Sequence, residues 1–442
     1  MLRKLLASAC LLAVAGLATA AGPPLGLAST RSGAFIHGQA STEGKSSAAV
    51  PSSQPATPSP SKNLSPSPSN QPSPSFSNRP GASPSTTPTA APPSPPPTPT
   101  PTPTAPPTGT SGGVCIGVGG GPCQAPIASG LKPELAGLLD RNGAPSVSLA
   151  PDLGGWVVNV TWAALQPTSG SSIASDNPID QAIALIQTTP AYANMHLRIR
   201  IMAGIDSPGW VESMSGGSVY VNNDQSGTGG NVPRFWTAPV EQAYANLQAL
   251  LAARYDTSPE IEDVTTSACM TVFAEPLIRE VSDPTSVANL LAAGYTEAAD
   301  ETCQEDAVAA QGVWVHTHSS IALNPYQTIS ANGSTGVDES FTQTLMTYCR
   351  STLGDRCTLG NNSIRTASLG TQYDQMYSAM QASGPGIYFQ TAQASLVGDL
   401  QSTILWAISE GANDVELPSG YASILSAAQL AADNQALGSC RQ

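Results

Sequence analysis

The sequence has few charged residues, and basic residues are fewer than acidic ones. Lys and Arg number 17 against 31 Asp and Glu, the net charge is −14 at pH 7, and the basic residues form no cluster. Phosphate repels an acidic chain without basic patches, so we expect no nucleic-acid partner. The chain has only four His, none at metal-ligand spacing, and no C-x-x-C. The sequence therefore predicts neither a metal site nor another cofactor.

Long apolar runs are also missing, apart from a short one at the start. A positively charged beginning precedes the apolar stretch 5–17, and Ala18-Thr19-Ala20 follows it. This order is typical of a secretory signal peptide, which we place at 1–20. The apolar stretch is too short to favour a spanning helix. Lipid attachment at Cys10 is disfavoured, since apolar residues continue beyond it. We expect a secreted protein, free or associated with the cell surface, without a membrane span.

Aromatic and charged residues almost vanish from the next segment. Residues 50–113 contain one aromatic residue, Phe76, and two charges, Lys62 and Arg79, among Pro, Ser and Thr. Such a composition buries too little apolar area to offset chain entropy. We interpret residues 21–113 as a disordered Pro/Ser/Thr-rich linker. Its proline runs favour an extended spacer, and a passive, glycosylated linker is the alternative.

Cysteine is sparse, but its spacing is informative. Beyond the signal peptide, two pairs each enclose seven residues, which suits small disulfide loops: Cys115/Cys123 and Cys349/Cys357. Cys269 and Cys303 then pair across a longer loop, and Cys440 is left over. Structural disulfides fit an exported protein.

All six tryptophans lie in residues 114–442, which we interpret as one globular domain. Short β-branched or alternating runs in it predict strands at 156–162, 196–202, 263–268, 313–316, 363–368, 386–391 and 414–417, with an eighth at 146–150. Helical spacing predicts helices at 178–187, at 400–408, and after an N-cap at Thr237. Strands separated by helices indicate parallel βαβ units. The predicted fold class is therefore α/β, a (β/α)8 TIM barrel.

Three motifs follow the first three of these strands, where a barrel places its active site. Trp162 opens W-x-x-L-x-P-x-x-G, Gly204 opens G-x-x-x-P-x-W, and Glu275 precedes Pro276. Their order resembles the TIM-barrel retaining glycoside hydrolases, the clan with cellulase-like and β-galactosidase-like families, in a divergent form. The resemblance covers roughly residues 155–276.

The resemblance implies a pair of catalytic carboxylates. Glu275 matches the general acid/base that follows the fourth strand in this clan, although Ala274 stands where an Asn is usual. The nucleophile would end the seventh strand, but here that strand ends in Gln390, and a neutral amide cannot attack an anomeric carbon. Glu416, one strand later, is the preferred second carboxylate, and Asp206 is an alternative.

Six residues are candidates for substrate binding, each with a plainer interpretation. Trp162 and Trp210 suit sugar stacking or ordinary packing. His316 and His318 share one side of a predicted strand, while Gln390 suits a sugar hydroxyl. Asp206 either binds substrate or caps a turn.

The predicted function is hydrolysis of a β-linked glycan by paired carboxylates, without a cofactor. The substrate is then a polysaccharide or oligosaccharide, and we expect a monomer. The alternative is a catalytically inactive barrel that binds polysaccharide or the cell surface.

Overall fold

The computed structural model describes residues 130–438 of the chain. The predicted signal peptide, the linker, Cys115, Cys123 and Cys440 lie outside these residues.

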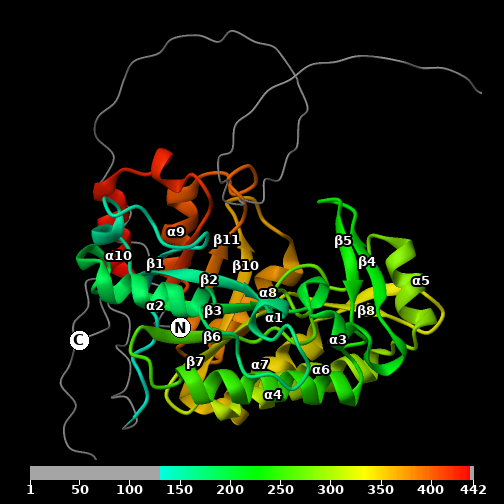
Figure 1. The fold of residues 1–442 in the computed structure, drawn as a ribbon. Coiled ribbons are helices and arrows are strands. Elements are labelled where there is room, and N and C mark those ends of the chain that lie inside the picture. The colour runs from blue at the N-terminus through cyan, green and yellow to red at the C-terminus, as the bar shows by residue number, and fades with distance from the viewer. Residues whose placement is uncertain (1–129, 439–442) are drawn as a thin grey trace, which may run out of the picture. The chain divides into compact units, whose positions relative to one another are not determined.

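Eight parallel strands close into a barrel, in the order β1-β12-β11-β10-β7-β6-β3-β2 (Figure 1). This confirms the predicted (β/α)8 fold class. The strands are β1 (Gly137–Asp140), β2 (Gly155–Thr161), β3 (His196–Met202), β6 (Ile261–Thr265), β7 (His318–Ala322), β10 (Cys357–Ile364), β11 (Ile387–Thr391) and β12 (Asp414–Leu417).

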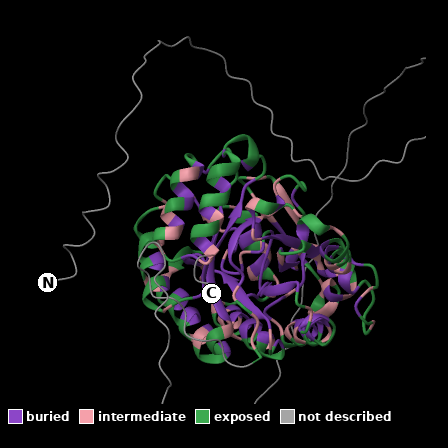
Figure 2. Cartoon of the chain, turned by 90° about the vertical axis from the view of Figure 1, so that its left-hand side faces the viewer, coloured by how far each residue is buried: buried purple, intermediate pink, exposed green. Residues whose placement is uncertain are grey.

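Helices lie between the strands and surround the barrel. They are α1 (Trp162–Leu165), α2 (Pro178–Thr188), α3 (Gly209–Glu212), α4 (Ala238–Tyr255), α5 (Pro284–Ala292), α6 (Glu297–Ala310), α7 (Glu339–Leu353), α8 (Thr371–Ala382), α9 (Leu400–Ser409) and α10 (Ala427–Gly438). Figure 2 shows buried strands at the centre and helices with exposed outer faces. In α2, for example, Ile179, Ala182 and Ile186 are buried on one face, and Asn177 and Asp180 form a capping box at its start.

Two antiparallel hairpins extend the loops. Strands β4 (Val219–Asn223) and β5 (Thr228–Val232) pair after α3, and β8 (Tyr326–Ile329) pairs with β9 (Thr335–Asp338) after β7. The β4–β5 hairpin packs against α5. A second apolar cluster lies beneath it, separate from the barrel core.

Three predicted strands were placed wrongly. The first barrel strand is β1, not 146–150, where a turn and a 3-10 helix with Pro151 occur instead. Residues 313–316 do not form a β-strand. The backbone N–H groups of Val315, His316 and Thr317 donate to the carboxylate of Asp256 instead of to a neighbouring strand. The strand follows them, as β7. The strand predicted at 363–368 is β10, which ends at Ile364 and is rich in polar residues that hide its signal.

Both disulfides that the cysteine spacing predicted within the described residues are present. Cys269 pairs with Cys303, and Cys349 pairs with Cys357. The first joins the loop after β6 to α6. That loop carries Glu275, so the disulfide restricts the segment that holds the main candidate residue.

Candidate active site

Glu275 lies in the loop between β6, the fourth strand of the barrel, and α5. The loop has no regular secondary structure and turns tightly, with the Glu275 N–H donating to the Phe273 carbonyl at 2.7 Å. The carboxylate is half-buried and accepts a hydrogen bond from Asn324 Nδ2 at 3.0 Å. Asn324 follows the C-terminal end of β7. Glu275 is thus held at the mouth of the barrel, where TIM-barrel enzymes place their catalytic groups.

The surroundings of Glu275 favour its protonated form. Burial raises the pKa of its carboxyl group above the ordinary value. The hydrogen bond from Asn324 and the positive charges of Arg200 and Arg365 act in the opposite direction without cancelling the effect of burial. A carboxyl group with a raised pKa suits the role of a proton donor.

A polar chain fixes Asn324 in turn. Its Oδ1 accepts from Asn361 Nδ2 at 3.2 Å and from the Tyr373 hydroxyl at 3.2 Å. The Tyr377 hydroxyl donates to Asn361 Oδ1 at 3.1 Å. Because each amide is held on both sides, the donor that faces Glu275 has a defined orientation. None of these residues is among the candidates predicted from the sequence, although the paired asparagines within β10 were a usable signal.

Glu416 lies inside the barrel on β12, in a very different environment. Its side chain is 0% exposed, and Oε1 accepts from Arg198 Nη1 at 2.9 Å and Arg200 Nη2 at 2.5 Å. Burial acts to raise the pKa of Glu416, but the two guanidinium groups outweigh it and hold the pKa below its ordinary value. Oε2 is buried and has no hydrogen-bond partner within the part of the chain that the structure describes.

The same interior holds two more carboxylates. Arg198 donates from Nε to Asp263 at 2.8 Å and from Nη1 and Nη2 to Asp414 at 2.8 and 2.9 Å. The guanidinium also lies 4.0 Å from the centre of the Tyr388 ring. Burial raises the pKa of Asp414 to about 7, despite the opposing charge of Arg198. The centre of the barrel is therefore an ion-pair network rather than an apolar core.

Arg200 connects the interior with the mouth. Its Nη1 donates to Gln390 Oε1 at 3.1 Å, its Nη2 donates to Glu416, and its charge acts on Glu275. Gln390 is half-buried and donates from Nε2 to the Asn362 carbonyl at 3.0 Å. Three sequence-predicted residues, Glu275, Gln390 and Glu416, are thus gathered around one arginine that sequence reasoning missed. The alternation of Arg198 and Arg200 with apolar residues along β3 was its signal.

The two histidines lie elsewhere. His318 begins β7 and His316 precedes it, so both are at the opposite end of that strand from Asn324. His316 Nδ1 contacts the Gly130 carbonyl, and His318 Nε2 contacts the Lys132 carbonyl at 2.9 Å. The prediction that they share one side of a strand is wrong, because the strand begins at His318 and His316 lies before it. They pack against the segment that leads into β1.

The aromatic candidates divide into one buried and one accessible residue. Trp162 is 1% exposed, with its ring against Trp210 and Tyr244, so it cannot stack on a sugar. Trp210 is half-buried and donates from Nε1 to the Gln166 carbonyl at 3.0 Å, which leaves it a candidate. Asp206 is half-buried at the end of a 3-10 helix, Gly204–Asp206.

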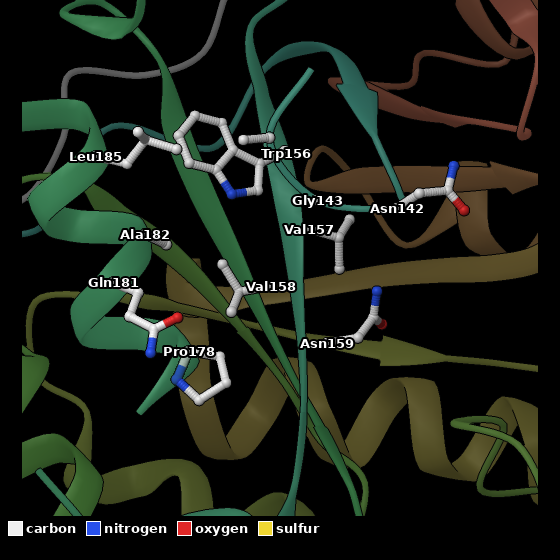
Figure 3. Close-up of a pocket in the computed structure, with 11 residues that line it drawn as sticks. Asn142, Gly143, Trp156, Val157, Val158, Asn159, Pro178, Gln181, Ala182 and Leu185 are labelled. Atoms are coloured by element: carbon white, nitrogen blue, oxygen red, sulfur yellow. The ribbon is translucent and has the colours of Figure 1, made fainter. Parts of the chain in front are cut away.

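Two cavities of similar size occur near strand ends. One, of about 280 Å³, lies between β2, α2 and the loop after β1, and no ionisable side chain lines it (Figure 3). The other, of about 300 Å³, lies between the loop after β10 and helices α8 and α9, and its lining includes Arg365, Asp374 and Trp406. Within residues 130–438, no three His, Cys, Asp or Glu side chains are grouped to hold a metal ion. No helix in that range has the length and apolar character needed to cross a membrane.

Comparison with family models and with curated proteins finds no match. Solved structures with a similar fold include an endo-β-1,4-glucanase from Xanthomonas axonopodis pv. citri, at 12% identity, 71% coverage of this chain, full coverage of the other and a TM-score of 0.38. An endo-glycoceramidase II from Rhodococcus sp. has 14% identity, coverages of 66% and 76%, and a TM-score of 0.38. Morphinone reductase has 13% identity, coverages of 65% and 83%, and a TM-score of 0.36. At these values the likeness concerns the barrel and indicates no reaction.

Proposed function

We propose that the chain is a glycoside hydrolase that cleaves a β-linked glycan, with Glu275 as general acid/base and Glu416 as the ionised partner. The observation that carries the proposal is the opposite direction of two pKa shifts around Arg200. Burial raises the pKa of Glu275, while the arginines lower that of Glu416. Two carboxyl groups whose environments separate their pKa values in this way suit an acid and a charged partner.

In this mechanism Glu275 transfers its proton to the glycosidic oxygen as the bond from that oxygen to the anomeric carbon breaks. The Glu416 carboxylate balances the positive charge that develops on the sugar. If Glu416 bonds to the anomeric carbon, water then breaks that bond while Glu275, now ionised, takes the proton of the water. If Glu416 instead assists the water, Glu416 takes that proton. Whether Glu416 bonds to the sugar or assists the water depends on the carboxylate separation, about 5 Å for the first route and roughly 6.5–9.5 Å for the second.

Export and a polymeric substrate complete the proposal. The two disulfides suit an oxidising compartment, as the signal-peptide pattern also indicates. A Pro/Ser/Thr-rich segment before the barrel suits a spacer between the enzyme and a surface or bound polymer. We propose that the protein acts as a monomer on polysaccharide or oligosaccharide.

The test is turnover by the full chain on aryl β-glycosides and on insoluble polysaccharides, compared with Glu275→Gln. We expect a loss of kcat of about 10²–10⁴-fold, the usual contribution of a general acid. The glutamine keeps the size of the side chain and an acceptor for Asn324, so the fold should be retained, as circular dichroism will show. Equal turnover by the two proteins would refute the role of Glu275.

A non-catalytic sugar-binding barrel is the second candidate function. It is favoured by the complete burial of Glu416, which two arginines hold away from solvent, and by the amide at the end of the seventh strand. This candidate predicts retention of the wild-type chain on insoluble polysaccharide with no release of sugar. Sugar release that Glu275→Gln abolishes selects the enzyme instead.

A further inference from the structure

The cavity of about 300 Å³ between α8 and α9 has the composition of a ligand site. Its lining combines a guanidinium, a carboxylate, two hydroxyl side chains of α9 and an indole: Arg365, Asp374, Ser402, Thr403 and Trp406. The volume is at the small end of the range of ligand pockets, about 300–1,000 Å³. It therefore suits one ring of a ligand rather than a polymer segment.

The charged groups of this cavity are not paired with each other. Arg365 donates from Nε and Nη2 to Ser363, and Nη1 makes no hydrogen bond within residues 130–438. The Asp374 carboxylate is exposed, and no side chain or backbone N–H of those residues donates to it. One group only donates and the other only accepts. The hydroxyl groups of a sugar complement both side chains, since a hydroxyl can accept from a guanidinium and can donate to a carboxylate.

The aromatic wall of the cavity is preformed. The Trp406 ring lies 5.1 Å from that of Tyr377 and 5.3 Å from that of Phe389, in edge or tilted contacts. Phe389 is buried on β11, so the barrel fixes the orientation of the indole. Trp406 itself is only half-buried. A rigid, partly exposed indole supplies a flat apolar surface at a small entropic cost.

Two connections join this cavity to Glu275. Arg365 lines the cavity, and its charge also acts on the Glu275 carboxyl group. Tyr377 lines it too, and its hydroxyl begins the hydrogen-bonded chain through Asn361 and Asn324 to Glu275. The cavity and the mouth of the barrel are thus linked by one charge and by one hydrogen-bonded chain.

We infer that the cavity between α8 and α9 is a second sugar-binding site, which takes one neutral hexopyranose unit. The inference rests on the proposed function for the class of ligand. A neutral sugar is preferred because the cavity holds one cationic and one anionic side chain, so a charged ligand that is attracted by one of them is repelled by the other. The role of this site is to hold part of the glycan while another part occupies the mouth.

The experiment measures binding of methyl β-D-glucoside, methyl β-D-galactoside and methyl β-D-mannoside by ligand-observed NMR, with D-glucuronate as the charged probe. All proteins are full-length and carry Glu275→Gln, so that no probe is consumed. Ser402→Tyr fills the cavity from an exposed position on α9. Ser409→Tyr makes the same change at another exposed position on α9 that does not line the cavity.

We expect at least one neutral glycoside to bind, at least a tenfold loss of affinity in Ser402→Tyr, and unchanged affinity in Ser409→Tyr. Equal affinity in both variants, no binding of any neutral glycoside, or tighter binding of glucuronate would overturn the inference. The outcome is separable from the proposed function. Hydrolysis that depends on Glu275 without a Ser402-sensitive site supports the enzyme alone, whereas Ser402-sensitive binding without hydrolysis supports the sugar site alone.

Discussion

Glu275 and Glu416 share an arginine but occupy two different regions of the barrel. Glu275 is at the mouth, half-buried, with one hydrogen bond from an amide. Glu416 is in the interior, fully buried, with two guanidinium groups on one of its oxygens. Removal from water destabilises both charges, yet only Glu416 receives enough positive charge to bring its pKa below the ordinary value. The same side chain thus has pKa shifts of opposite sign, because two guanidinium groups bond directly to Glu416, whereas the two arginines that act on Glu275 do so only through their charge.

The interior network is expected to dominate stability. In Arg198→Leu, the Asp263, Asp414 and Glu416 carboxylates lose their shared partner while they remain buried. We expect a loss of about 3–5 kcal/mol in the free energy of unfolding, measured by urea denaturation at neutral pH. Glu275→Gln, the control at the mouth, should change it by less than about 1 kcal/mol. Equal stability of Arg198→Leu and wild type would mean that these carboxylates are uncharged.

Arg200→Met removes the group that joins the two regions. The charge-assisted hydrogen bond to Glu416 is lost, so stability should fall by about 1.5–3 kcal/mol, less than in Arg198→Leu, since Arg198 still pairs with Glu416. Arg200 lowers the pKa of both Glu275 and Glu416. Its removal raises both, so the rising and falling limbs of the pH–rate profile should both move to higher pH. A profile in which neither limb moves would contradict the electrostatic link.

Asp414→Asn separates the pH dependence of the interior from that of the mouth. The pKa of Asp414 is raised to about 7 in the folded chain, above its unfolded value of about 3.9. Its stabilising contribution is therefore complete below the unfolded pKa and is lost as pH rises through about 7. The Asp414→Asn variant lacks this pH-dependent contribution to stability. Between these two pH values, its free energy of unfolding should fall less with rising pH than that of wild type.

Thermal or urea unfolding at several pH values checks this prediction. The contribution of Glu416 to stability depends on pH in the opposite direction. Because the pKa of Glu416 is lowered by folding, this contribution is present above the pKa of the unfolded chain and is lost as pH falls through the pKa of the folded chain. Because Glu416 is intact in both proteins, its term cancels in their difference. Parallel curves for the two proteins would show that Asp414 remains ionised throughout.

The periodicity of the sequence was sufficient to predict the barrel, but not to predict where every strand begins and ends. The strands β3 and β12 match the predicted ranges, because their apolar or β-branched residues alternate or are continuous. β7 was misplaced, since a distant carboxylate, Asp256, takes up the N–H groups just before it. No local pattern reveals such a partner. β10 was misplaced because Asn361 and Asn362 are used for hydrogen bonding rather than packing.

The candidate site was likewise predicted only in part from the sequence. The motif order led to Glu275, and its place after the fourth strand follows from counting strands once β1 is included. Arg198 and Arg200 were visible as charges in an apolar strand, but their partners come from β6, β11 and β12, far along the chain. Which charges meet inside a barrel depends on how its strands close, and this is a property of the fold rather than of any one segment.

The smallest expected effect comes from Gln390, which lies between the two regions. In Gln390→Glu the acceptor for Arg200 is kept, but the Nε2 donor to the Asn362 carbonyl is lost. We expect a loss of about 0.5–1.5 kcal/mol in the free energy of unfolding, the net contribution of one hydrogen bond. Gln390→Met, which loses both contacts, is the matched control and should lose more. Gln390→Glu could instead be more stable than wild type. That result would mean that Glu416 alone does not neutralise the charge of Arg200, so that the mouth of the barrel carries a net positive charge.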